Sequence, residues 1–159
     1  MLPLTGASHR KGSCRMISYD TNILIYAIEG HPQFGAAARA IVQQGETDGA
    51  TVSVLLQHEF LSGVALHNPR DMNTAAALFE TFVSTVFEPV SAQICQRAAA
   101  MTARYGRKLS GYDALHLATA VLAGSQVFYT NDKLLLELEC SEIAITPLVS
   151  QIPPHATDV

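Results

Sequence analysis

Short apolar runs alternate with longer segments of mixed apolar and polar residues along most of this chain. Five of the short runs end close to a turn or helix-capping residue, a pattern that is typical of buried strands. The strands that it predicts are Ile17–Tyr19, Ala50–Val52, Phe87–Val90, Val127–Tyr129 and Ile143–Ile145.

The longer segments have helical character and recognisable ends. Ser53 and Ser91 are suited to the N-cap position of a helix, and Asn68 precedes a proline, where helical backbone is disfavoured. Glycines predict a turn over Gly45–Gly49 and a loop over Gly106–Ser110. The expected helices are Ile23–Ile28, Phe34–Gln44, Val54–His67, one from an Asp71 or Asn73 cap to about Thr85, one from Ser91 to Tyr105, Gly111–Ala123, and a short one from Asp132 to Glu139.

Strands that alternate with helices predict an α/β fold. Parallel strands need crossover connections, and right-handed crossovers place helices on either side of the sheet. We therefore expect one three-layer α/β/α domain with a central parallel five-stranded sheet over residues 16–149. Residues 1–15 show no periodicity and are expected to form a disordered leader, and residues 150–159 a loose tail.

The composition fits one domain with a sizeable core. The chain has 159 residues, of which 48% are hydrophobic. No apolar run approaches the ~20 residues of a membrane-spanning helix, and no apolar segment follows the basic N-terminus as in a secretory signal. The three cysteines lack paired or zinc-binding spacing, which indicates reduced thiols. We therefore expect a cytoplasmic protein without a membrane contact.

Two aspartates follow predicted strands. Asp20 comes directly after Ile17–Tyr19, and Asp132 comes shortly after Val127–Tyr129. The carboxyl ends of parallel strands meet at one edge of the sheet, where α/β proteins bind ligands. Each aspartate is also a good helix N-cap, and capping explains its position about as well. The two roles are compatible because a carboxylate has two oxygens.

Two further acids lie in predicted helices. Glu59 is flanked by apolar residues, so a buried or cleft-facing carboxylate is plausible, although an isolated helical glutamate is usually solvated. A buried carboxylate must be protonated, paired or bound to a metal ion. Asp113 lies in the first turn of its helix, where the helix dipole alone favours an acid.

Taken together, these acids favour a metal site. Carboxylates brought close together repel one another, and a divalent cation relieves the repulsion. Oxygen ligands without a cysteine or a histidine pair favour a hard ion such as Mg²⁺ or Mn²⁺. A site of this kind is suited to hydrolysis of a phosphodiester.

Four segments of the sequence carry a family resemblance. They are ISYDTNILIYA, VSVLLQHEFLSG, LSGYDALHLATAVLAGSQVFYTNDKLL and EIAITPL, in this order along the chain. Together they resemble the PIN-domain family, and most of all the toxin nucleases of VapBC toxin–antitoxin modules. The similarity covers roughly Met16 to Leu148, and YDALHLATA followed by a strand and TND is its most specific part.

The resemblance implies a metal-dependent endoribonuclease that is the toxin of a toxin–antitoxin pair. The family's four acidic positions, which hold Mg²⁺ or Mn²⁺ for catalysis, are matched by Asp20, Glu59, Asp113 and Asp132. Asn22 matches a polar position that helps to order the site, and Thr130 matches a hydroxyl position near the last acid. The implied partners are an RNA substrate, an antitoxin whose tail enters the site, and a second copy of the chain in a homodimer.

The charge of the chain is unusual for an RNA-binding protein. The formal net charge is −4, and from Met16 onward seven basic residues stand against fourteen acidic ones. A local patch must therefore contact the phosphates, unless bound metal ions do so. The candidates are Arg104, Arg107, Lys108 and Lys133. For the three that precede Asp113, a solvated helix end favoured by the dipole is an equally good interpretation.

Other readings remain open. The main alternative is a non-catalytic PIN-like module that binds RNA or protein, although the presence of all four acids argues against it. A phosphotransfer enzyme of the haloacid dehalogenase type is disfavoured, because Asn22 stands where a second aspartate is needed. We expect His116 to be a hydrogen-bonded core histidine, His58 to point away from the site, and Tyr112 to pack rather than stack on a base.

Overall fold

The computed structural model describes residues 16–150. A parallel sheet lies at the centre of the protein. The strand order is β3-β2-β1-β4-β5, and every neighbouring pair is parallel. The sequence predicted all five strands of this sheet, with bounds that differ by at most two residues at either end. The strands are β1 (Ile17–Tyr19), β2 (Ala50–Ser53), β3 (Thr85–Glu88), β4 (Val127–Tyr129) and β5 (Ala144–Thr146).

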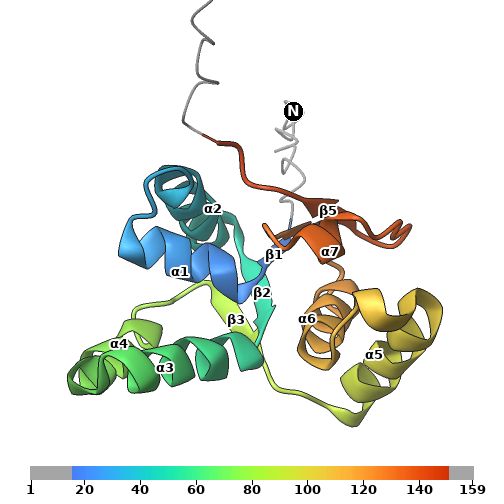
Figure 1. The fold of residues 1–159 in the computed structure, drawn as a ribbon, viewed down its shortest axis with the longest axis horizontal. Coiled ribbons are helices and arrows are strands. Elements are labelled where there is room, and N and C mark those ends of the chain that lie inside the picture. Colours follow the sequence, from blue (N-terminus) through green and yellow to red (C-terminus); the bar gives the residue numbers. More distant parts are fainter. Residues whose placement is uncertain (1–15, 151–159) are drawn as a thin grey trace, which may run out of the picture.

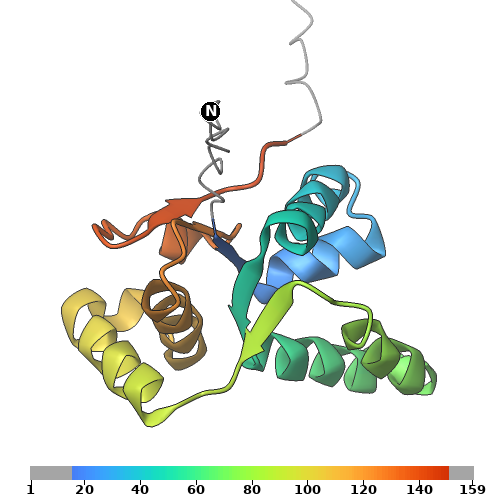
Figure 2. The same cartoon turned by 180° about the vertical axis from the view of Figure 1, so that it is seen from behind.

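Helices cover both faces of this sheet (Figures 1 and 2), which confirms the predicted three-layer α/β/α fold. They are α1 (Thr21–Glu29), α2 (Gly35–Asp48), α3 (Leu55–His67), α4 (Met72–Phe79), α5 (Ala92–Tyr105), α6 (Gly111–Leu122) and the short α7 (Lys133–Leu136). Two 3₁₀ turns, Pro69–Asp71 and Gly106–Lys108, precede α4 and α6. None of the helices in residues 16–150 is long and apolar enough to cross a membrane. The expected leader over 1–15 and most of the expected tail lie outside the described residues.

Two hydrophobic cores form on opposite sides of the sheet. Side chains alternate between the faces of a strand, so Ile17 and Tyr19 of β1 point into a core shared with α1 to α4. Phe128 of β4 points into the other core, which α5, α6 and α7 complete. The intervening strand residues on the α6 side of β1 and β2 are small and buried, which allows α6 to approach β2 closely. They are Ser18, Thr51 and Ser53.

The predicted turn over Gly45–Gly49 is wrong, because α2 continues to Asp48. Gly45 lies inside the helix and is buried against β2, and a Cβ built on it would come within 2.9 Å of the Ala50 Cβ. The glycine therefore permits close helix–strand packing rather than a turn. Only Gly49, with a φ of 96°, has the positive backbone angle that turns the chain into β2.

Glu46 in the last turns of α2 anchors the segment before β3. Its carboxylate accepts hydrogen bonds from the backbone N–H groups of Val83, Ser84 and Thr85 and from the Thr85 hydroxyl, at 2.5–3.1 Å. These bonds satisfy the N–H groups that lead into the strand, so β3 begins at Thr85, two residues before the predicted start. Burial alone would raise the pKa of Glu46, but the hydrogen bonds from Thr85, Val83 and Ser84 outweigh it and lower the pKa below 4.5.

Replacing this carboxylate should destabilise the fold in a pH-dependent way. A lowered pKa in the folded state adds stability above the unfolded pKa, and that stability is lost as the pH falls through the folded pKa. We expect Glu46→Gln to lower the free energy of unfolding by about 1–3 kcal/mol at pH 7, with a smaller difference near pH 3. Urea unfolding at both pH values measures this, with the exposed Glu80→Gln as control. Equal losses at both pH values would contradict the account.

Candidate metal centre

Asp20 lies at the carboxyl end of β1, where the chain enters α1. One carboxylate oxygen, Oδ1, accepts the backbone N–H of Thr21 at 2.7 Å, so Asp20 is the N-cap that the sequence allowed. The other, Oδ2, accepts the Thr130 hydroxyl at 3.0 Å and the Asn22 side-chain amide at 3.2 Å. The residue is only 7% exposed. Asn22 thus lies beside the first acid, and Thr130, which the resemblance related to the last acid, contacts Asp20 through its hydroxyl and also accepts the Asp132 backbone N–H at 3.0 Å.

Burial raises the pKa of Asp20 above its ordinary value of 3.8. The charge of His116 and the hydrogen bonds from Thr130 and Thr21 act in the opposite direction, but they do not outweigh burial. The Asp113 carboxylate is near enough to raise the pKa further. Ionised Asp20 is therefore short of compensating positive charge, which a bound cation would supply.

Glu59 lies on the second turn of α3, and its carboxylate is close to that of Asp20. Its Oε2 accepts hydrogen bonds from the Thr21 hydroxyl at 2.5 Å and from His116 Nε2 at 2.7 Å. Burial raises the pKa of Glu59, yet hydrogen bonds from His116 and Thr21, with the charges of His116 and His58, lower it below 4.5. Its Oε1 makes no hydrogen bond within residues 16–150 and is open to a ligand.

His116, which the sequence analysis assigned to the hydrophobic core, is a member of this site. The expectation of a buried, hydrogen-bonded histidine is confirmed, since it is 2% exposed, but its partner is the candidate ligand Glu59. Its Nδ1 is buried without a partner among the described residues. The spacing of three residues from Asp113, which puts both on one face of α6, is the signal that could have revealed it.

The ligand atoms of Asp20, Glu59 and His116 lie within 4.8 Å of one another. They come from three separate elements, β1, α3 and α6, which meet at the carboxyl edge of the sheet. This edge, between β1 and β4, is where the strand order reverses direction and where open α/β sheets bind ligands. Two carboxylates with an adjacent imidazole are side chains that divalent metal ions take as ligands.

Asp113 and Asp132 are not part of this close group. The Asp113 Oδ2 accepts the Ser110 hydroxyl at 2.5 Å, while Ser110 Oγ accepts the Asp113 backbone N–H, so the two residues cap the start of α6. Asp132 Oδ1 accepts the N–H groups of Leu134 and Leu135 and caps α7. Asp132 adopts the capping role that the sequence left open, whereas Asp113 lies in the first turn of α6, where the helix dipole was the alternative explanation. Each acid keeps one carboxylate oxygen without a hydrogen bond in the described chain.

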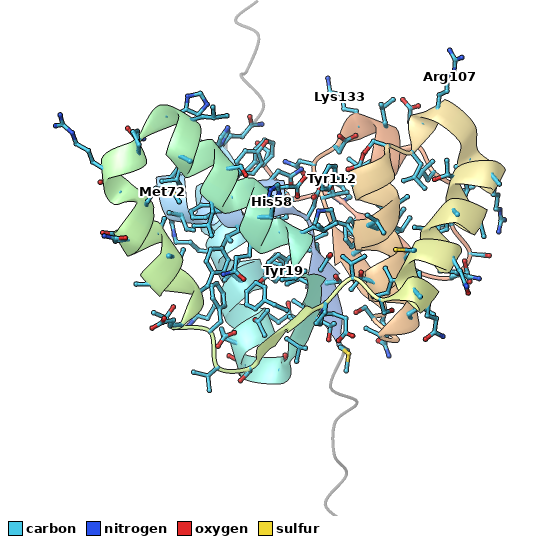
Figure 3. All side chains as sticks on the ribbon, turned by 90° about the horizontal axis from the view of Figure 1, so that it is seen from below. Tyr19, His58, Met72, Arg107, Tyr112 and Lys133 are labelled. Carbon is cyan, nitrogen blue, oxygen red and sulfur yellow. The ribbon has the colours of Figure 1, made fainter. Side chains whose placement is uncertain are left out.

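The four basic candidates differ in their surroundings. Arg104 lies over the ring of Tyr105, with 5.3 Å from its Cζ to the ring centroid, and Lys108 pairs with Glu137 at 3.6 Å. Arg107 and Lys133 are exposed and make no ion pair within residues 16–150. Figure 3 shows both projecting from the same end of the molecule. They are the cations that remain available to a phosphate.

The profile of the PIN domain matches residues 17–139, which is most of the chain. The chain belongs to the PIN-domain family. The match includes β1 to β4 and all the residues of the centre described above. A search of curated proteins finds no match to this PIN domain.

Solved structures with the same fold come from toxin–antitoxin complexes. VapBC2 from Rickettsia felis, bound to a promoter DNA fragment, aligns with a TM-score of 0.64 and 16% identity, over 83% of this chain and 98% of that one. VapBC from Salmonella typhimurium, also bound to DNA, gives 0.63 and 20% over 83% and 97%. A toxin–antitoxin complex from Klebsiella pneumoniae gives 0.59 and 22% over 78% and 92%. At these identities the likeness concerns the fold.

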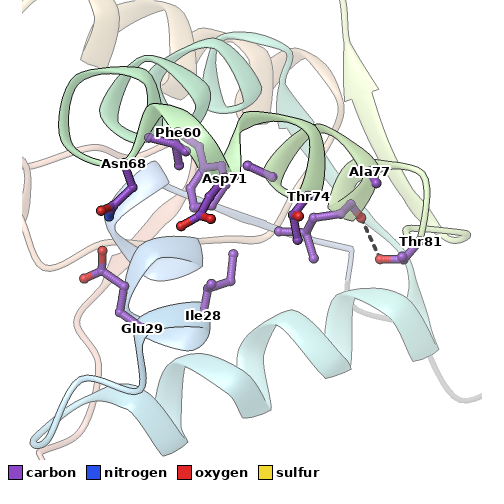
Figure 4. A pocket seen from close by; sticks show the side chains of 11 residues that line it. Ile28, Glu29, Phe60, Asn68, Asp71, Thr74, Ala77 and Thr81 are labelled. Atoms are coloured by element: carbon purple, nitrogen blue, oxygen red, sulfur yellow. Dashed lines mark hydrogen bonds between the residues drawn. The ribbon is translucent and has the colours of Figure 1, made fainter.

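An apolar pocket lies apart from the residues of the centre, none of which lines it. It lies between α1, α3 and α4, has a volume of about 530 Å³ and includes Phe60, the neighbour of Glu59 (Figure 4). Ile28, Val64 and Leu78 contribute apolar surface, and Asp71 lies among the polar residues that line it. The PIN domain thus has an apolar surface between α1, α3 and α4 in addition to its acidic group.

The pKa values of the two carboxylates at the centre should be shifted in opposite directions from their ordinary values. In metal-free protein we expect Asp20 to titrate above pH 3.8 and Glu59 below pH 4.5, because burial dominates at the first and hydrogen bonds at the second. Carboxyl ¹³C NMR titration, assigned with Asp20→Asn and Glu59→Gln, measures both. His116→Leu should raise the pKa of Glu59, whereas His67→Leu, on the same helix as Glu59, should not. An unmoved Glu59 in His116→Leu would contradict the hydrogen-bond account.

Proposed function

We propose that this PIN domain is a metal-dependent endoribonuclease and acts as the toxin of a toxin–antitoxin pair. The observation that carries the proposal is the convergence of Asp20 and Glu59, from β1 and α3, at the switch point of the parallel sheet. Membership in the family supports the same conclusion.

In this proposal Asp20 and Glu59 hold Mg²⁺ or Mn²⁺. When bound, the ion supplies charge neutralisation at a phosphoryl oxygen and activation of water. Thr130 and Asn22 orient Asp20 through its Oδ2, and His116 fixes Glu59 through Oε2, which leaves Oε1 directed to the ligand. In-line attack of water on phosphorus would leave a 5′-phosphate and a 3′-hydroxyl.

Asp113 and Asp132 complete the acidic set in this proposal through their unbonded oxygens. A carboxylate can cap a helix with one oxygen and bind an ion or water with the other. Asp113 is electrostatically close to Asp20. Their roles would be to receive a second ion or to orient water. If they remain only helix caps, the alternative of a non-catalytic module that binds RNA or protein gains weight.

RNA is the proposed substrate despite the acidic balance of the chain. Arg107 and Lys133, which have no ion-pair partner in the described chain and project from the same end of the molecule, would contact phosphates of the bound RNA. Lys133 immediately follows Asp132, so it lies beside the acidic set. A few exposed cations together with bound metal are sufficient in this view, because a divalent ion itself attracts the phosphate.

The proposed protein partners are an antitoxin and a second copy of the chain. The solved relatives named above are complexes of the toxin–antitoxin type, which supports an antitoxin. The pocket between α1, α3 and α4 offers an apolar surface to such a partner.

Mn²⁺ should stabilise the fold through Asp20. An ion at a hundredfold excess over its dissociation constant adds about 2.7 kcal/mol to the free energy of unfolding. Because the pKa of Asp20 is raised, protons compete with the ion, and the stabilisation should grow as the pH rises through that pKa. Thermal unfolding with Mn²⁺ and with EDTA between pH 4 and 7 measures this. Asp20→Ala should lose the effect and Asp71→Ala, at the exposed cap position of α4, should keep it. An unchanged Mn²⁺ effect in Asp20→Ala would exclude Asp20 as a ligand.

Cleavage of RNA tests the activity itself. Purified protein incubated with total RNA should give discrete fragments in Mg²⁺ or Mn²⁺ and none in EDTA. Asp20→Ala should reduce the cleavage rate by at least about a hundredfold, since even residues that only orient a metal ligand contribute 10–100-fold. Asp71→Ala serves again as the control. Mn²⁺ binding without turnover on any RNA would favour the binding-module alternative.

A further inference from the structure

Two exposed aromatic rings flank the acidic group. His58 of α3 and Tyr112 of α6 lie with their ring planes at 2° to each other and their centroids 6.5 Å apart. Tyr112 is 48% exposed and His58 is also exposed. Figure 3 shows the pair where α3 and α6 face each other, at a distance in sequence of more than fifty residues. We call these two residues the aromatic pair.

The aromatic pair differs from what the sequence predicted for either ring. Tyr112 is exposed and does not pack into the core, and His58 does not lie apart from Tyr112, because the two rings are parallel neighbours. A distance of 6.5 Å between ring centroids is near the upper limit for interacting aromatic rings. The two rings therefore interact only weakly with each other. Both side chains are exposed, so a third aromatic group can contact them.

The aromatic pair lies next to the acidic centre on both helices. His58 and Tyr112 directly precede Glu59 and Asp113 in the chain. Tyr112 is also four residues before His116, so it lies one turn above the imidazole on the same face of α6. A nucleotide whose phosphate reached Asp20 and Glu59 would thus place a neighbouring base within range of these rings.

From this arrangement we infer that the aromatic pair stacks an unpaired base of the RNA beside the scissile phosphate. The inference rests on the proposed ribonuclease function and adds the two side chains that would contact a base of the substrate. Proteins that recognise single-stranded RNA stack splayed bases on aromatic side chains, and such contacts accept every base. A base inside a duplex is covered by its neighbours, so the aromatic pair selects single-stranded or looped RNA.

A single tryptophan can report this stacking directly. The chain has no tryptophan, so Tyr112→Trp in the full-length protein provides one fluorophore at the proposed contact, and Val83→Trp provides a control at an 89% exposed position before β3. In Mg²⁺, a short single-stranded RNA that resists cleavage should quench the Tyr112→Trp fluorescence. An abasic RNA of the same length should not, and Val83→Trp should respond to neither.

Anisotropy of a labelled RNA separates this inference from the proposed function. If the RNA binds and cleavage is retained, but Tyr112→Trp is not quenched or the abasic RNA quenches it equally, the stacking inference is overturned while the ribonuclease proposal stands. If neither RNA binding nor cleavage is found for the wild-type chain, both are overturned.

Steady-state cleavage provides a second, independent test. A stacked base is worth about 5- to 150-fold in affinity, so Tyr112→Ala should raise KM by that factor with little change in kcat. Tyr112→Phe, which keeps the ring, should restore most of the loss. Leu66→Ala, at the 80% exposed end of α3, is the control. A fall in kcat at unchanged KM, or no rescue by phenylalanine, would overturn the assignment of stacking.

Discussion

The buried carboxylate of Asp20 is the constraint on which the rest of the site depends. Its position is fixed by the backbone, because the Asp20 N–H donates to the Tyr129 carbonyl at 2.9 Å and so extends the pairing of β1 with β4. Its oxygens then bind groups from α1 and from the end of β4, including the hydroxyl of Thr130. One side chain thus joins two central strands and the first helix at the edge where the sheet changes direction.

The neighbours of Asp20 set the electrostatics of the centre. Burial raises the pKa of Asp20, whereas hydrogen bonds from His116 and Thr21 lower that of Glu59. The two acids therefore differ in how readily they lose a proton, although they converge on one point. A divalent ion would stabilise both ionised forms, and this is the physical link between the fold, the proposed metal dependence and the proposed hydrolysis of RNA.

The sequence by itself determined the architecture and the first elements of the site. Strands of three or four apolar residues, N-caps and helix ends are local signals, so the order of elements and the parallel sheet could be predicted. Asp20 at a strand end and Glu59 in an apolar helix were identified for the same reason, and Asn22 lies where the motif placed it. The pattern failed at Gly45, since a glycine that permits close packing and one that makes a turn look alike in sequence.

Only the tertiary structure decided which side chains meet. His116 contacts Glu59 across 57 positions of sequence. Its spacing from Asp113 places both on one face of α6, but that local pattern does not identify its partner on α3. Likewise, the helix dipole explained Asp113 and a helix cap explained Asp132 about as well as a metal site did, and the structure places both at helix starts outside the close group. Local propensity determines where helices and strands form, but the packing of α3 and α6 against the sheet determines which of their residues share one site.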